Sequence, residues 1–113
     1  MNVVRVKEGV KFTVIAPGGF RILGAIDDAC QKVGVDLTIT SACDGEHSGP
    51  NDPHHRGEAY DVRSHDFTEE QKDDILTEVM TYLGWDHFFG FLEAMGTDNE
   101  HFHFQVKKGT QFP

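Results

Sequence analysis

The sequence predicts a small single α+β domain, in which two helices pack on a mainly antiparallel sheet. Its 113 residues suffice for one hydrophobic core but not for two domains. Two segments repeat apolar residues at the helical spacing of three and four, and several shorter segments alternate apolar and polar side chains. We expect residues 1–113 to form one domain with the order β-α-β-loop-β-α-β-β, and residues 1–10 and 108–113 to be loose ends.

Two strands around one helix are expected in the N-terminal half. Residues 11–16 alternate weakly and end at Pro-Gly-Gly, which predicts a short strand closed by a turn. From 20 to 33, apolar side chains beginning with Phe20 mark one face of a helix, and Gly34 is suited to end it. The β-branched segment 35–42 predicts a strand whose inward side chains are Val35, Leu37 and Ile39.

Beyond a polar loop at residues 43–56, the second half predicts a strand, a helix and a hairpin. Residues 57–63 form the strand, and Thr68 begins the helix with a Thr-x-x-Gln capping box that Gln71 completes. This helix is expected to end near Leu83. Residues 86–94 and 100–107 then predict two strands joined by a turn.

Composition and charge exclude several classes of function. The formal charge is −9, from 10 basic and 19 acidic residues, without a cluster of Lys and Arg that would bind nucleic acid. No apolar run approaches the roughly 18 residues of a membrane span, and the first residues do not resemble a signal peptide. Two cysteines are too few for a disulfide framework. We expect a monomer made in the cytoplasm and not inserted into membranes.

A metal site is predicted around the strand at 57–63. Its alternation places Gly57, Ala59 and Asp61 on one side, where the small residues are expected to leave clearance above the carboxylate. His54 arrives from the preceding loop, and His103 of the final strand is the best candidate for a third ligand. Imidazole and carboxylate suit zinc, and three protein ligands leave a position open for hydrolytic chemistry.

Two residues compete for the role of base beside such a metal. In the final strand His101 shares the face of His103, whereas strict alternation places Glu100 on the opposite face. Glu100 reaches the site only from an irregular first residue or over a bulge. The simplest division assigns proton transfer to Glu100 and a hydrogen bond to the developing oxyanion to His101.

These residues resemble a known signature. Residues 54–61, His-His-Arg-Gly-Glu-Ala-Tyr-Asp, match the His-x-x-Gly-x-Ala-x-Asp pattern of zinc D-Ala-D-Ala carboxypeptidases and L-alanyl-D-glutamate endopeptidases, the peptidase M15 family. Residues 100–103, Glu-His-Phe-His, resemble its second half, an acidic residue three positions before a histidine. Residues 40–48 are similar to a Thr-Ser-x-x-Asp-Gly-x-His-Ser stretch of short phage- and prophage-associated members, and 61–63 to their Asp-x-Arg. The similarity spans about residues 35–106 in the expected order.

The resemblance implies a hedgehog/DD-peptidase-like fold and a hydrolase that degrades cell wall, as a phage endolysin does. It implies one Zn²⁺ on His54, Asp61 and His103, with Glu100 as general base acting on a metal-activated water. The implied substrate is a peptidoglycan stem peptide, cut as a carboxypeptidase or as an endopeptidase. Without a signal peptide, such an enzyme would act at the cell wall after release through a pore, after lysis, or from a phage particle.

The chain departs from the family pattern at two positions that concern substrate contacts. Asp52 stands where the family usually has Ser, and Asp44 stands where many relatives have an Arg that holds a substrate carboxylate. Arg63 lies on the Asp61 face and either supplies that positive charge or forms a salt bridge to Asp61 or Asp66. Arg63, His47 and Asp44 are the candidate substrate contacts, although His47 equally suits a hydrogen bond within its own loop.

Two other functions fit parts of the pattern. A catalytically silent metal-binding module on the same fold, such as a component of a phage particle, would use the same three ligands. A cupin-like metal oxygenase also places His-x-His on a strand. No glutamate follows His103 at the cupin spacing and the predicted helices are too long for a pure barrel, so the oxygenase ranks below the peptidase.

Overall fold

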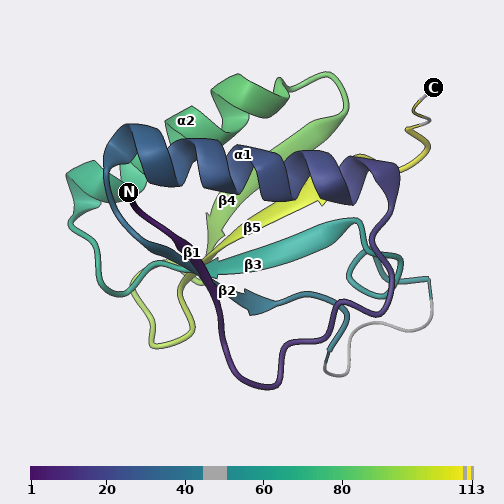
Figure 1. Ribbon diagram of the computed structural model, residues 1–113, viewed down its shortest axis with the longest axis horizontal. Helices are drawn as coiled ribbons and strands as arrows, with labels where there is room; N and C mark the ends of the chain where they lie inside the picture. The colour runs from purple at the N-terminus through teal and green to yellow at the C-terminus, as the bar shows by residue number, and fades with distance from the viewer. Residues whose placement is uncertain (45–50, 111, 113) are drawn as a thin grey trace.

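The protein has an α+β fold in which two helices lie on one face of a five-stranded sheet (Figure 1). The structure is a computed structural model, and it describes residues 1–44, 51–110 and 112. The elements in chain order are β1 (Val4–Val6), α1 (Pro17–Val33), β2 (Leu37–Ser41), β3 (Ala59–Arg63), α2 (Glu69–Leu83), β4 (Phe88–Glu93) and β5 (His101–Val106).

The sheet has the strand order β1-β2-β3-β5-β4. β1 runs parallel to β2, and every other neighbouring pair is antiparallel, which confirms the mainly antiparallel sheet. The helices pack against each other and against the sheet, so the core lies between the two layers. Figure 1 shows the opposite face of the sheet without a helix, and this open face carries the side chains of interest.

Helix α1 begins three residues earlier than expected, at Pro17, so the Pro-Gly-Gly segment is its first turn. Proline suits this position because the first helical N–H has no partner within the helix. Gly19 packs tightly, since a Cβ there would lie 2.1 Å from the Gly57 carbonyl oxygen. Phe20 is 62% exposed and does not belong to the buried face, whereas Gly34 ends the helix in the left-handed conformation as expected.

Helix α2 confirms the predicted capping box. The Thr68 side chain accepts a hydrogen bond from the Gln71 N–H, and the Gln71 side chain accepts one from the Thr68 N–H. Glu69 and Glu70 lie in the first turn, where the helix dipole stabilises negative charge. In β2, the expected inward side chains Leu37 and Ile39 are buried.

Two expectations about the N-terminal part of the chain were wrong. Residues 11–16 form no strand; they cross the molecule as a connection whose Ala16 N–H donates to the Gly57 carbonyl. The first strand lies instead within the expected loose end, because Val4–Val6 pairs with β2. Near the other end, the Phe112 ring packs against Phe88, and Arg21 lies over it at 4.2 Å. No helix among the described residues has the length and apolar character needed to cross a bilayer.

Candidate metal centre

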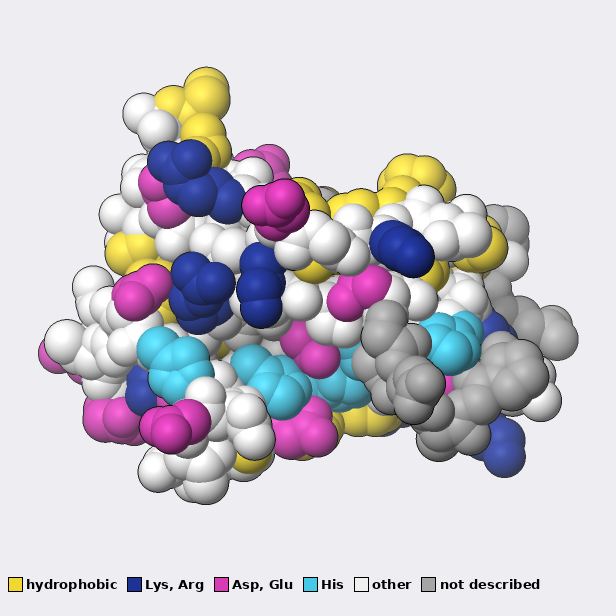
Figure 2. All heavy atoms as spheres, turned by 90° about the horizontal axis from the view of Figure 1, so that it is seen from below, with side chains coloured by type: hydrophobic (Ala, Val, Ile, Leu, Met, Phe, Trp, Pro, Cys, Tyr) yellow, Lys and Arg dark blue, Asp and Glu magenta, His cyan; other side chains and the backbone are white. Residues whose placement is uncertain are grey.

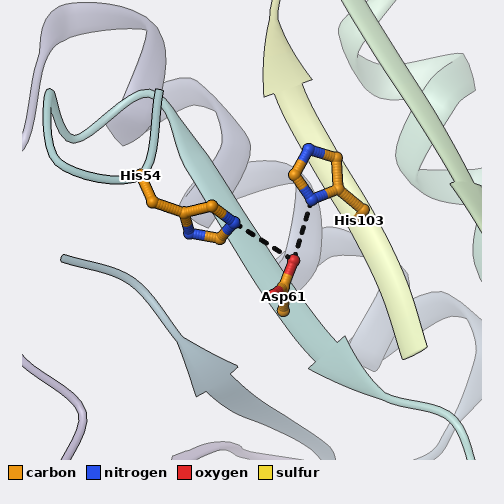
Figure 3. Close-up of side chains that lie close together, drawn as sticks. All are labelled: His54, Asp61 and His103. Carbon is orange, nitrogen blue, oxygen red and sulfur yellow. Dashed lines mark hydrogen bonds and ion pairs between the residues drawn. The ribbon is translucent and has the colours of Figure 1, made fainter. Parts of the chain in front are cut away.

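Three side chains from separate segments meet on the open face of the sheet (Figure 3). Strands β3 and β5 pair with Asp61 directly opposite His103, so their side chains project from the same face. The Asp61 Oδ1 lies 2.9 Å from His103 Nδ1 and 3.4 Å from His54 Nε2. The structure therefore brings together the three residues for which the sequence predicted a metal.

His54 is held by a compact turn just before β3. The Asp52 carboxylate accepts a hydrogen bond from the His54 N–H at 2.9 Å, so Asp52 shapes this turn at the position where the resemblance expects Ser. The buried His54 ring donates from Nδ1 to the Ala42 carbonyl at 2.9 Å. Nε2 faces Asp61 at 3.4 Å, so it donates to that carboxylate when the ring is protonated and offers a lone pair to a cation when the ring is neutral.

His103 makes hydrogen bonds through both ring nitrogens. Nδ1 lies 2.9 Å from Asp61 Oδ1 and Nε2 lies 2.8 Å from the side-chain oxygen of Gln105. Burial lowers the pKa of His103, but the hydrogen bonds to Asp61 and Gln105 and the charges of Asp61 and Glu93 raise that pKa above its ordinary value. A proton on Nδ1 thus occupies the place that a metal would take, with Gln105 orienting the ring in either state.

The Asp61 carboxylate remains ionised in this setting. Burial raises its pKa, but hydrogen bonds from His103 and His54 and the nearby histidine charges together bring that pKa well below its usual range. Zinc with bonds of about 2.0–2.1 Å places tetrahedral ligand atoms about 3.3 Å apart. The separations of 2.9 and 3.4 Å are near that spacing, and all three ligand atoms lie within 4.8 Å of one another, so this group of side chains could hold one metal ion.

A second carboxylate that sequence reasoning missed lies beside the three ligands. Glu93 ends β4 directly opposite His101 in β5, and its Oε2 lies 3.2 Å from His101 Nε2 and 3.8 Å from His103 Nδ1. His101 Nδ1 donates to the Asn99 carbonyl at 2.6 Å, and its Nε2 lies 3.6 Å from Asp61 Oδ2. The hairpin register could have identified Glu93, since Phe89, Phe91 and Glu93 alternate onto the face of His101 and His103.

Glu100, expected as the base, lies on the other side of the sheet. Its carboxylate accepts hydrogen bonds from the Ser64 hydroxyl at 2.8 Å and the Gly96 N–H at 3.1 Å, and pairs with Lys72 of α2 at 2.7 Å. Strict alternation along β5 is kept, so no bulge carries Glu100 to the face of His103. Among the described residues, neither cluster of possible metal ligands includes Glu100.

The candidate ligands line a cavity of about 280 Å³ together with Asp52, Pro53, Glu93, His101 and Gln105. Phe91 and Phe89 stack on each other as an aromatic pair beside the site, with ring centres 5.4 and 6.2 Å from that of His103. Figure 2 looks onto this face and shows a row of histidine side chains, with acidic side chains among them and basic ones along one side. Among the described residues, the site is therefore a cavity that is polar at its centre.

The three candidate substrate contacts have different positions. Arg63 lines a neighbouring cavity of about 300 Å³ that also includes Lys7, His65 and His101. The Asp44 Oδ1 accepts hydrogen bonds from the N–H groups of Ala42 and Lys11, and Asp44 does not line the metal-site cavity. His47 lies outside the described residues.

Gly57 is small for a different reason from the expected clearance above the Asp61 carboxylate. Its φ is +71°, and a Cβ there would lie 2.2 Å from the Val14 carbonyl oxygen. Gly57 therefore gives clearance to the connection at residues 11–16, not to a metal. Ala59 is fully buried beside this turn.

Comparison of the chain with models of protein families, with curated proteins and with solved structures gives no match.

Proposed function

We propose that the chain is a zinc-dependent peptidase that hydrolyses an amide bond in the stem peptide of peptidoglycan, as a D-Ala-D-Ala carboxypeptidase or an L-Ala-D-Glu endopeptidase. The observation that carries the proposal is the convergence of His54, Asp61 and His103 in one cavity, with Glu93 and His101 beside them. Two sequence motifs resemble those of zinc peptidases. Residues 54–61 supply His54 and Asp61, and residues 100–103 supply His103.

In this proposal the metal is held by His54 Nε2, Asp61 Oδ1 and His103 Nδ1. A zinc ion there supplies Lewis acidity, which polarises an amide carbonyl and makes a water molecule more acidic. The Ala42 carbonyl and the Gln105 side chain hold the two imidazole rings in position from behind. Three protein ligands leave room for a water or substrate oxygen, as hydrolysis requires.

Glu93 takes the role of base that was expected of Glu100. Its side chain is 48% exposed and borders the cavity, so its carboxylate can accept a proton from an attacking water and pass it to the leaving amine. His101, when protonated, donates from Nε2 to the oxygen on which negative charge develops. Glu100 instead belongs to a buried ion pair with Lys72 and contributes to stability.

Substrate binding is assigned to the two sides of the metal site. Phe89 and Phe91 offer an apolar wall for the methyl groups of alanine residues. On the other side, Arg63 and Lys7 line the neighbouring cavity, where a guanidinium binds a carboxylate through two hydrogen bonds. A stem peptide carries both kinds of group. The enzyme would reach it after release from the cell in which it is made, or from a phage particle.

The test is digestion of purified peptidoglycan with and without a chelator, followed by mass analysis of the fragments. We expect release of D-Ala, or a cut between L-Ala and D-Glu, that the chelator prevents and added zinc restores. His54→Ala is expected to abolish it, whereas His87→Ala, at an exposed histidine outside the cavity, is expected to retain it. Absence of both products from the zinc-loaded protein would refute the proposal.

One observation favours the alternative, a catalytically silent metal-binding module that serves as a structural component. The acidic residue that the sequence motif offers as base is engaged by Lys72 and Ser64 and stays away from the cavity. Stoichiometric zinc without turnover, together with unchanged properties of Glu93→Gln, would support this alternative. Loss of turnover in Glu93→Gln with zinc still bound would exclude it.

A further inference from the structure

We propose that Asp61, Glu93 and His101 form a second, weaker cation site, and that a transition-metal ion such as Zn²⁺ bound there inhibits the peptidase. The inference rests on the proposed function for its inhibitory effect, and on the geometry of these three side chains for the binding. It concerns regulation of the same cavity, since the second site shares Asp61 with the first.

The two oxygens of Asp61 face different histidines. Oδ1 lies between His54 and His103, at 3.4 and 2.9 Å, whereas Oδ2 lies 3.6 Å from His101 Nε2. Glu93 Oε2 lies 3.2 Å from the same His101 nitrogen. These separations are again close to the spacing of about 3.3 Å between tetrahedral zinc ligands, so one carboxylate can bridge two ions.

His101 is built like the ligand His54. Its Nδ1 donates to a backbone carbonyl, that of Asn99 at 2.6 Å, as His54 Nδ1 donates to that of Ala42 at 2.9 Å. In both neutral rings the lone pair is therefore on Nε2 and faces carboxylate oxygens. A backbone carbonyl that accepts from the other ring nitrogen is one of the common ways in which a metal-binding histidine is oriented.

The second site is expected to bind more weakly than the first. The side chains of His101 and Glu93 are 24% and 48% exposed, against 7% and 11% for His54 and His103, so water competes more effectively for the ion. Two divalent ions on one carboxylate also repel each other. Occupation inhibits because the ion takes the Glu93 oxygen and the His101 lone pair that would otherwise carry protons.

The experiment measures bound metal by calorimetric titration of the metal-free protein with zinc, and by elemental analysis after dialysis. The wild type is expected to bind two ions with distinct affinities. Glu93→Gln and His101→Ala are each expected to retain only the tighter ion, and His54→Ala only the weaker one. His87→Ala is the matched control and is expected to bind two. Circular dichroism verifies that each variant is folded.

Each result decides a different point. One ion in the wild type, unaffected by Glu93→Gln and His101→Ala, overturns the second site and leaves the first intact. Two ions in both variants also overturn it, because the second ion then lies elsewhere. No bound zinc overturns both the second site and the metal centre of the proposed function. In the active wild type, peptidase activity is expected to peak near one equivalent of zinc and to fall at least tenfold as the second ion binds; activity that stays constant overturns the inhibition.

Discussion

Lys72 of α2 and Glu100 form a buried ion pair, with Nζ 2.7 Å from Oε1. The pair lies between the helices and the sheet, whereas the candidate metal ligands lie on the open face. The hydrogen bond from Lys72, with those from the Gly96 N–H and the Ser64 hydroxyl, lowers the pKa of Glu100 to about 2. The acidic residue that the motif offers as a base is thereby assigned to stability.

Replacing Glu100 by Gln is expected to make the protein less stable in a way that depends on pH. The folded-state pKa of Glu100 is below its ordinary value of 4.5, so its stabilisation is present above about pH 4.5 and is lost as the pH falls towards 2. At pH 7 we expect a loss of about 1.5–3 kcal/mol, the range for hydrogen bonds to charged groups.

Urea unfolding of the metal-free protein between pH 2 and pH 7 measures this effect. The free energies of unfolding of wild type and Glu100→Gln are expected to converge at the acidic end. Asp73→Asn, at an exposed position of α2 beyond its first turn, is the control and should differ little from wild type at any pH. A constant difference across the range would contradict the assignment.

Variants of Glu93 and Glu100 are expected to distinguish an effect on catalysis from an effect on stability. Glu93→Gln is expected to lower kcat by about 10²–10⁴-fold, because it removes the group that carries the proton. Glu100→Gln is expected to keep kcat within a few-fold at temperatures where it is folded. Steady-state rates on a stem peptide, measured at one equivalent of zinc, test both. The opposite order of effects would return the role of base to Glu100.

Gln105 is expected to control zinc affinity without touching the ion. Its side-chain oxygen accepts a hydrogen bond from His103 Nε2 at 2.8 Å and so fixes the ring that presents Nδ1. Removing such a partner typically costs about 10–100-fold in metal affinity. We predict that loss for Gln105→Leu in competition titrations with a zinc indicator. Gln31→Leu, on the exposed side of α1, should leave the affinity unchanged.

Gly57→Ala is expected to destabilise the protein and to weaken metal binding. An added Cβ would lie 2.2 Å from the Val14 carbonyl oxygen, and the φ of +71° is unfavourable for alanine. The turn that carries His54 must then shift, at a cost of about 1–3 kcal/mol. Gly9→Ala is the control, because Gly9 has a φ of +91° with nothing within 4 Å. Equal melting temperatures for the two variants would show that the unfavourable φ alone destabilises the protein and that the contact with the Val14 carbonyl oxygen adds nothing.

Arg63 is expected to act on substrate binding. Arg63→Gln should raise KM for a peptide with a free terminal carboxylate by about 10-fold or more, the scale of a lost charged hydrogen bond. It should have little effect on kcat, since Arg63 lines the neighbouring cavity and not the metal site. The same peptide with an amidated terminus provides the comparison. An equal KM change for both peptides would exclude a contact between Arg63 and the carboxylate.

Local rules were enough to predict several elements and the shared face of Asp61 and His103. The capping box of Thr68 and Gln71 uses only neighbouring residues, and it formed as predicted. The residues 11–16 also alternate, yet they form no strand, because strand formation needs a partner and Gly57 packs against Val14 there instead. Short alternation without a defined partner is therefore the weakest of these signals.

By itself, the sequence determined which faces of β3 and β5 carry Asp61 and His103, since side chains alternate with a period of two in any strand. Alternation also places the side chains of Glu100 and His103 on opposite faces of the sheet. What those two faces contact depends on how the strands and helices pack together. Pairing of β4 with β5 brought Glu93 beside His101, and packing of α2 brought Lys72 to Glu100. Lys72 and Glu100 are distant in the chain, and their contact depends on how α2 docks on the sheet, which no local pattern specifies. Glu93 and His101 face each other across one hairpin, and their contact depends on its exact register.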